Sequence, residues 1–171
     1  MGAYKISPHL RPKFKDARMI GRGLFTRCYH KPGSNRVLLV SRCAAKYVLA
    51  TEGYGSSSLF PPLKYLEEHV YEAPFYPKES LNKLNSLHRA YYTCLRRMYV
   101  KAMNDYWDDF SISNIYWEEL FEDIPFPHLR KALLDAYRKL SPSMEVNFEI
   151  SPRNVKVHKG KLILLDVFVI Y

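Results

Sequence analysis

The sequence predicts an α+β protein with an antiparallel sheet in its first half, helices in its second half and a β-hairpin at its end. Residues 18–75 contain short apolar runs separated by glycine and proline, which is typical of strands. Residues 78–140 instead place apolar side chains at steps of three and four, which is typical of helices. Strands followed by helices favour a fold in which the helices lie apart from the main sheet.

Length and composition limit the class of protein. The chain has 171 residues, enough for one domain or one small two-lobed unit with its own core. Its hydrophobic content of 47% is typical of a globular protein. No apolar run approaches the roughly 20 residues needed to cross a bilayer, and the three cysteines form no Cys-x-x-Cys pair. We therefore expect a cytoplasmic protein with no membrane partner, no disulfide framework and no cysteine zinc site.

The positive net charge of the chain favours anionic partners but does not indicate which kind. The formal net charge is +9 and the isoelectric point is near 9.4. Nucleotides, nucleic acid and acidic protein surfaces all suit such a chain. The basic residues are spread along the sequence rather than gathered in a run, which is equally typical of a solvated surface.

Two helices are expected between the predicted sheet and the terminal hairpin. The apolar stripe of the first is formed by Leu81, Leu84, His88, Tyr91, Leu95, Met98 and Ala102. Pro125 and Pro127 interrupt this pattern. The stripe of the second helix, which ends before Pro142, is formed by Leu129, Leu133, Leu134, Tyr137 and Leu140.

A glycine hairpin is expected near the N-terminus. Gly21 and Gly23 allow a tight turn and bring backbone N–H groups close to a phosphate, and Phe25 at the tip is placed to close over it. An apolar strand over 36–40 follows. Gly-x-Gly alone is a weak signal, and an ordinary β-turn explains it as well.

The last 25 residues form the most informative stretch. Two short apolar strands enclose a turn at 158–161, with Asn154 before the first strand and Asp166 after the second. A hairpin brings such positions side by side, and paired Asn and Asp oxygens suit a hard cation. We predict that the two face one another across one cation. The alternative is that Asp166 caps a strand and Asn154 satisfies a loop.

Together these motifs resemble the protein-kinase-like superfamily from about Ile20 to Phe168, and in compactness the short kinase-like proteins of podovirus-type bacteriophages. The resemblance implies a miniature kinase-like fold. Residues 18–75 would form an antiparallel N-lobe sheet with a helix that starts near Arg42. Residues 76–171 would form a reduced helical C-lobe that carries the terminal β-hairpin, in a single compact unit.

The resemblance also implies roles for individual residues. Gly21 and Gly23 would cover the phosphates of ATP, with Thr26 where the third glycine of the kinase pattern falls. Asn154 and Asp166 would hold Mg²⁺, and the backbone around Glu72 to Tyr76 would contact the adenine. Residues 59–65 and 70–76 resemble the two strands that lead to this adenine-contacting segment.

The sequence departs from the kinase pattern at the catalytic positions. Leu39 stands where the phosphate-binding lysine belongs, so Arg42 or Lys46 would have to replace it; otherwise both are solvated charges. Glu149 occupies the position of the catalytic aspartate and is one methylene longer. A glutamate accepts a hydroxyl proton, but a displacement of about 1 Å costs roughly 10²-fold in rate. ATP and Mg²⁺ are therefore implied cofactors whose binding stays open.

Three functions follow from these observations. The first is a degenerate kinase-fold protein, nucleotide-binding or not, that modulates another macromolecule by contact; if phage-encoded, it would act on a host protein in the host cytoplasm. The second is an active phosphotransferase with Glu149 as base, Asn154 and Asp166 on Mg²⁺, and Arg42 or Lys46 on phosphate. The third is a basic nucleic-acid-binding module. The missing lysine and the lack of a platform for a peptide substrate place the first ahead of the second.

Overall fold

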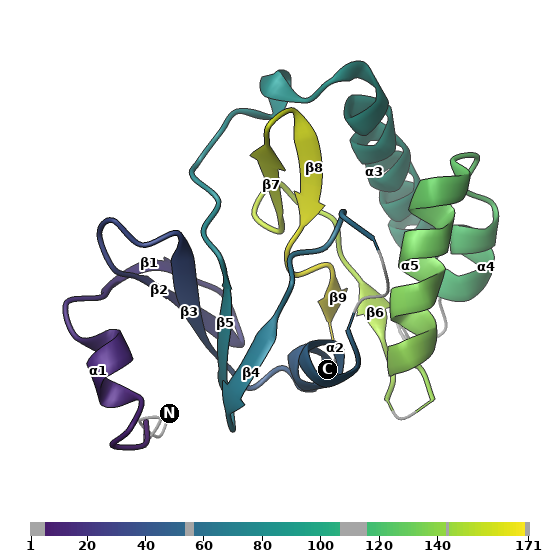
Figure 1. The fold of residues 1–171 in the computed structure, drawn as a ribbon. Coiled ribbons are helices and arrows are strands. Elements are labelled where there is room, and N and C mark those ends of the chain that lie inside the picture. The colour runs from purple at the N-terminus through teal and green to yellow at the C-terminus, as the bar shows by residue number, and fades with distance from the viewer. Residues whose placement is uncertain (1–5, 54–56, 107–115, 143, 170–171) are drawn as a thin grey trace.

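The computed structural model describes residues 6–53, 57–106, 116–142 and 144–169 (Figure 1). Its elements are, in chain order, α1 Arg11–Phe14, β1 Arg18–Arg22, β2 Thr26–His30, β3 Arg36–Ser41, α2 Ala44–Glu52, β4 Lys64–Glu67, β5 Val70–Pro74, the 3₁₀ turn η1 Leu81–Lys83, α3 Ser86–Tyr106, α4 Trp117–Glu122, α5 Pro127–Leu140, β6 Asn147–Phe148, β7 Val155–His158, β8 Lys161–Leu164 and β9 Phe168–Val169.

The first half of the chain forms a five-stranded antiparallel sheet in the order β1-β2-β3-β5-β4. Strand β3 is central, and Leu39 pairs with Cys28 of β2 on one side and with Tyr71 of β5 on the other. Most of β3 is buried on both faces, which explains its continuous apolar sequence. The predicted α+β class and the antiparallel sheet are confirmed. Strand β4 differs from the expected strand 59–65. It begins only at Lys64 and ends at Glu67.

The helices cover the opposite side of the molecule, with α2 and the β7–β8 hairpin between them and the sheet (Figure 1). Helix α2 begins two residues after Arg42, as predicted. The stripe of α3 is confirmed, since His88, Tyr91, Leu95 and Ala102 are buried. The stripe of α5 is confirmed as well: Leu129, Leu133, Leu134 and Leu140 are buried and Tyr137 packs partly buried against the core. Leu81 lies outside α3, in η1.

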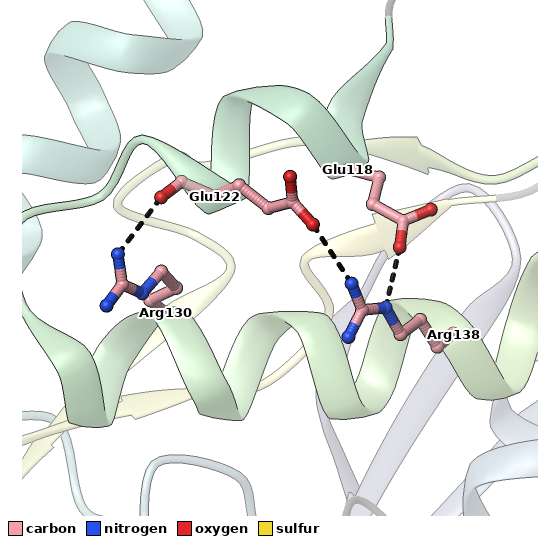
Figure 2. Close-up of polar contacts among 4 residues, drawn as sticks. All are labelled: Glu118, Glu122, Arg130 and Arg138. Atoms are coloured by element: carbon pink, nitrogen blue, oxygen red, sulfur yellow. Dashed lines mark hydrogen bonds and ion pairs between the residues drawn. The ribbon is translucent and has the colours of Figure 1, made fainter.

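Helix α4 was not expected from the sequence, and ion pairs hold it against α5. Arg138 donates to Glu118 Oε1 at 2.6 Å and to Glu122 Oε1 at 3.0 Å, and Arg130 donates to the carbonyl of Glu122 at 3.2 Å (Figure 2). The Glu118 carboxylate raises the pKa of Arg138. These groups are exposed, so we expect them to orient the two helices rather than to supply much stability.

Aromatic rings fill the core where α4 meets the two-stranded β6–β9 sheet. Phe148 lies 5.5 Å from Trp117, 5.2 Å from Phe121 and 5.9 Å from Phe168, measured between ring centroids. All four side chains are buried. One continuous core also includes Ala45 and Leu49 of α2, so α2 belongs to the same packed interior as the helical half.

The terminal hairpin has the predicted strands and a two-residue turn. Val155 to His158 pair with Leu164 to Lys161. Both turn residues have positive φ, 51° at Lys159 and 75° at Gly160, as a twisted two-residue hairpin requires. The Gly160 carbonyl accepts from the Asn85 N–H at 2.9 Å, just before α3. The hairpin tip is therefore fixed against the start of the long helix.

No helix in the described ranges combines the length and the hydrophobicity needed to cross a membrane.

His88 predicts a pH-dependent stability. It is 8% exposed, and its Nδ1 accepts the Leu162 N–H at 3.2 Å, so it must be neutral at that atom. Burial, followed by the positive charges of Lys161 and His128, lowers its pKa below 6.5. The unfolded chain takes up this proton below about pH 6.5 and the folded chain resists it. Stability is thus full above that pH and falls as the pH drops toward the lowered pKa.

We expect the urea midpoint of the wild type to fall between pH 7.5 and pH 5, a window above the titration of the carboxylates. His88→Leu should lower stability at pH 7.5 by about 1–3 kcal/mol, because the Leu162 N–H loses its acceptor, and should flatten the pH dependence. His128→Gln, a change at an exposed histidine, should keep most of the slope. An unchanged slope in His88→Leu would contradict this assignment.

Candidate functional site

The centre of the candidate site is an ion pair between α2 and the end of the terminal hairpin. Lys46 Nζ lies 2.6 Å from Asp166 Oδ1, across 120 positions of sequence. The Lys46 side chain is 6% exposed and that of Asp166 is 40% exposed. Lys46 is buried because it shares a face of α2 with Ala45 and Leu49, and this face enters the core. The expectation of a solvated charge at Lys46 is therefore wrong.

Backbone hydrogen bonds bring the other predicted residues to the same place. The Leu165 N–H donates to the Asn154 carbonyl at 2.8 Å, directly before Asp166. The Glu149 N–H donates to the Val167 carbonyl at 2.8 Å, directly after it. Glu149, Asn154 and Asp166 thus lie on adjacent backbone segments. Whether the side chains of Asn154 and Asp166 face one cation stays a prediction.

The segment from Glu149 to Asn154 is anchored by a residue that the sequence did not single out. Arg96 of α3 donates from Nη1 to the Ile150 carbonyl at 2.5 Å. Ile150 is fully buried, and Ser151 Oγ is buried with no hydrogen-bond partner among the described residues. A polar residue on a long helix gives no sequence signal that it reaches a loop 54 positions away.

The residues of this centre fit a divalent cation only in competition with Lys46. No three His, Cys, Asp or Glu side chains within the described ranges cluster as metal ligands. Asp166 and Asn154 would be the protein donors for Mg²⁺, and oxygen ligands of this kind suit it. The Lys46 ammonium already holds Oδ1 of Asp166. A cation would have to use Oδ2 or displace the ammonium.

A small cavity lies behind the ion pair. Its volume is about 10 Å³, and its walls include Phe60, Leu165 and Phe168 as well as the pair itself. This volume holds one water molecule at most. This cavity is therefore too small for a nucleotide.

The glycine hairpin differs in detail from the expectation. Neither Gly21 nor Gly23 has positive φ, and an added Cβ would lie 3.7 Å and 3.8 Å from its nearest neighbours, which is ordinary contact. The turn therefore does not require glycine at either position. Phe25 packs partly buried against the core, and the exposed apolar residue at the tip is Leu24. That Phe25 closes over a phosphate stays a prediction, as do the phosphate contacts of Gly21 and Gly23.

The other predicted phosphate ligands, Thr26 and Arg42, lie at the start of β2 and just after β3. The Thr26 hydroxyl lies 2.7 Å from the Ser41 hydroxyl, so it already has a polar partner on β3. Arg42 is exposed, and its backbone N–H donates to the Phe25 carbonyl at 3.1 Å. Their roles in nucleotide binding stay predictions.

A second lysine, Lys156, acts together with Lys46 on Cys28 of the sheet. Burial raises the pKa of Cys28 on β2 to about 11, and the charges of Lys156 and then Lys46 oppose this rise. Both ammonium groups therefore act on the thiol of Cys28. Lys156 lies on β7 and is half-buried, whereas its neighbours Val155 and Val157 are buried.

Comparison with known proteins finds similarity among solved structures, and this similarity is loose. No family model matches the chain, and no curated protein matches it. Among solved structures, the chain is similar to the ternary complex of streptomycin, ATP and the aminoglycoside phosphotransferase APH(2'')-IIa. The match covers 98% of this chain and 73% of that chain at 11% identity, with a TM-score of 0.42. The function proposed below rests on the residues of this chain.

The ion pair predicts an asymmetric response to mutation. Asp166→Ala leaves the Lys46 ammonium buried without its partner and should lower the free energy of unfolding by about 1–3 kcal/mol, less than for a fully buried pair because Asp166 is partly solvated. Lys46→Met keeps the volume and removes the buried charge, so it should cost less than about 1 kcal/mol. The double variant should be no less stable than Lys46→Met.

Urea denaturation of the three variants completes a double-mutant cycle. Asp135→Ala, which breaks the exposed Lys131–Asp135 pair on α5, is the matched control and should change stability by less than about 0.5 kcal/mol. Additive effects of Lys46→Met and Asp166→Ala would contradict the coupling of these side chains.

Proposed function

We propose that the chain is a degenerate kinase-fold protein with very low or no phosphate transfer, which acts by binding another macromolecule. The observation that carries the proposal is the 2.6 Å contact between Lys46 and Asp166. It holds a cation on the aspartate that a kinase-like site uses for Mg²⁺. Leu39, at the usual lysine position on β3, supplies no second cation for the phosphates.

The ion pair opposes Mg²⁺ binding for an electrostatic reason. Two cations on one carboxylate repel each other, and Lys46 is too buried to regain water when it is displaced. A phosphate oxygen would offer the displaced ammonium a new partner. Mg²⁺ alone is therefore a poor ligand, and ATP and Mg²⁺ bind together or not at all.

Glu149 is also a less favourable catalytic base for phosphoryl transfer than the aspartate of the kinase pattern. A base in phosphoryl transfer orients the attacking hydroxyl, while cations on the phosphates supply most of the rate. Loss of one such charge contact costs roughly 10²–10³-fold. With a longer base and a cation diverted to Asp166, we expect transfer to be slow even when nucleotide is bound.

Contact with another protein is the mode of action that these features favour. A net charge of +9 suits an acidic partner surface. The resemblance to short kinase-like phage proteins extends the proposal: if phage-encoded, the chain would modulate a host protein in the host cytoplasm.

An active phosphotransferase is the second candidate, and the position of Lys46 supports it. Lys46 reaches the site from α2 and is positioned beside Asp166, so it could replace the missing lysine of β3. Glu149 would act as base, and Asn154 and Asp166 would hold Mg²⁺. A basic nucleic-acid-binding module is the third candidate. Its affinity would have to fall steeply with salt.

Two measurements test the proposal. We expect wild type and Glu149→Gln to give equally low transfer of labelled phosphate from ATP. Any effect that the wild-type chain has when expressed in cells should persist in the variant. We also expect Mg²⁺ alone to leave the unfolding temperature unchanged, whereas ATP with Mg²⁺ at 100 times a dissociation constant would add about 2.7 kcal/mol. Glu145→Gln, an exposed glutamate four positions earlier, is the control. Efficient transfer that disappears only in Glu149→Gln would establish the phosphotransferase instead.

A further inference from the structure

A broad hollow on the helical half lies apart from the ion-pair site. Its volume is about 950 Å³, and it runs between α3 and the connection from α4 to α5. Its floor is apolar and is formed by Ala90, Cys94, Met98, Ile124, Pro125 and Phe126. Such a floor suits apolar side chains of a ligand.

Cations line the rim of this hollow. Arg89, Arg97 and Lys101 project from α3, and Asp123 is the one acidic residue among the described residues that line the hollow. Arg89 donates to the carbonyls of Asn82 at 2.7 Å and Leu84 at 3.3 Å, which leaves its charge without a carboxylate in the described part of the chain.

Arg97 and Lys101 stand one helical turn apart, where like charges repel. Both are exposed, and neither forms an ion pair with any described residue. A second hollow of about 490 Å³ on their other side is lined by both of them, with Arg96 and Asp105. The two side chains thus form a positive ridge between two hollows. An anionic partner would relieve this repulsion.

The dimensions match a helical segment. Arg89 and Lys101 are twelve positions apart on α3, or about 18 Å, which is three to four turns of a helix laid alongside. A nucleic acid would neutralise the ridge but leave the apolar floor uncovered. An amphipathic helix with an apolar stripe and acidic flanks satisfies both the floor and the rim.

We propose that the hollow between α3 and the α4–α5 connection docks an acidic amphipathic segment of another protein, with Arg97 and Lys101 against its carboxylates. This inference rests on the proposed function, in which the chain acts by contacting a macromolecule, and names the chemistry of the partner.

The test selects binders of the whole chain from a yeast-displayed library of random 16-residue peptides and measures their affinities by fluorescence anisotropy. We expect the enriched peptides to carry net negative charge and apolar residues at steps of three and four. Arg97→Glu combined with Lys101→Glu should weaken their binding at least 10-fold. Lys15→Glu combined with Arg18→Glu makes the same change in net charge at exposed residues elsewhere and should weaken binding less than 2-fold.

Several outcomes would overturn the proposal: no enrichment, enrichment of neutral or basic peptides, or equal effects of the two double variants. Tighter binding of a 20-nucleotide single-stranded DNA than of the peptides, lost on reversal of Arg97 and Lys101, would assign the ridge to nucleic acid. If the reversal variant unfolds, Arg97→Gln with Lys101→Gln replaces it, with an expected loss of at least 3-fold. The ATP-transfer measurement is independent, so failure of the docking surface and failure of the degenerate-kinase proposal are separate results.

Discussion

The buried ammonium of Lys46 constrains more of this structure than any other single group. A cation that is 6% exposed needs a partner, and Asp166 supplies it at 2.6 Å. This contact joins α2, which follows the central strand of the sheet, to the segment after β8. Backbone hydrogen bonds on either side of Asp166 then position Asn154 and Glu149. The geometry of the candidate site therefore depends on a contact that also opposes metal binding there.

Much of the fold was predictable because its elements are specified locally. Apolar steps of three and four marked α3 and α5, and the alternation around Lys159 and Gly160 marked the hairpin with its turn. Helix α4 was missed because six residues carry too little periodicity to stand out. The glycine hairpin between β1 and β2 forms as expected, but neither Gly21 nor Gly23 has positive φ, so these glycines are not needed for the backbone conformation of the turn.

The candidate site was predictable only in part, because it combines local and distant contacts. Asn154 and Asp166 flank one hairpin, and the pairing of its strands brings their backbones together. Lys46 and Asp166 are 120 positions apart, and no short-range pattern relates them. Lys46 looked like a solvated charge because its burial follows from how α2 packs on the helical half. Arg96 could not be predicted either, because its partner is a backbone carbonyl 54 positions away.

The two ends of α2 are held by different partners, and this affects how the molecule comes apart. Lys46, near the first turn, bonds Asp166, while Lys139 of α5 donates to the carbonyls of Glu52 and Gly53 at 2.8 Å each and so caps the last turn. A helix fixed at both ends to the helical half cannot leave with the sheet. The sheet and the helices should accordingly melt in one cooperative transition rather than as two independent lobes. The division of this small chain into a sheet and a helical half would then be geometric and not thermodynamic.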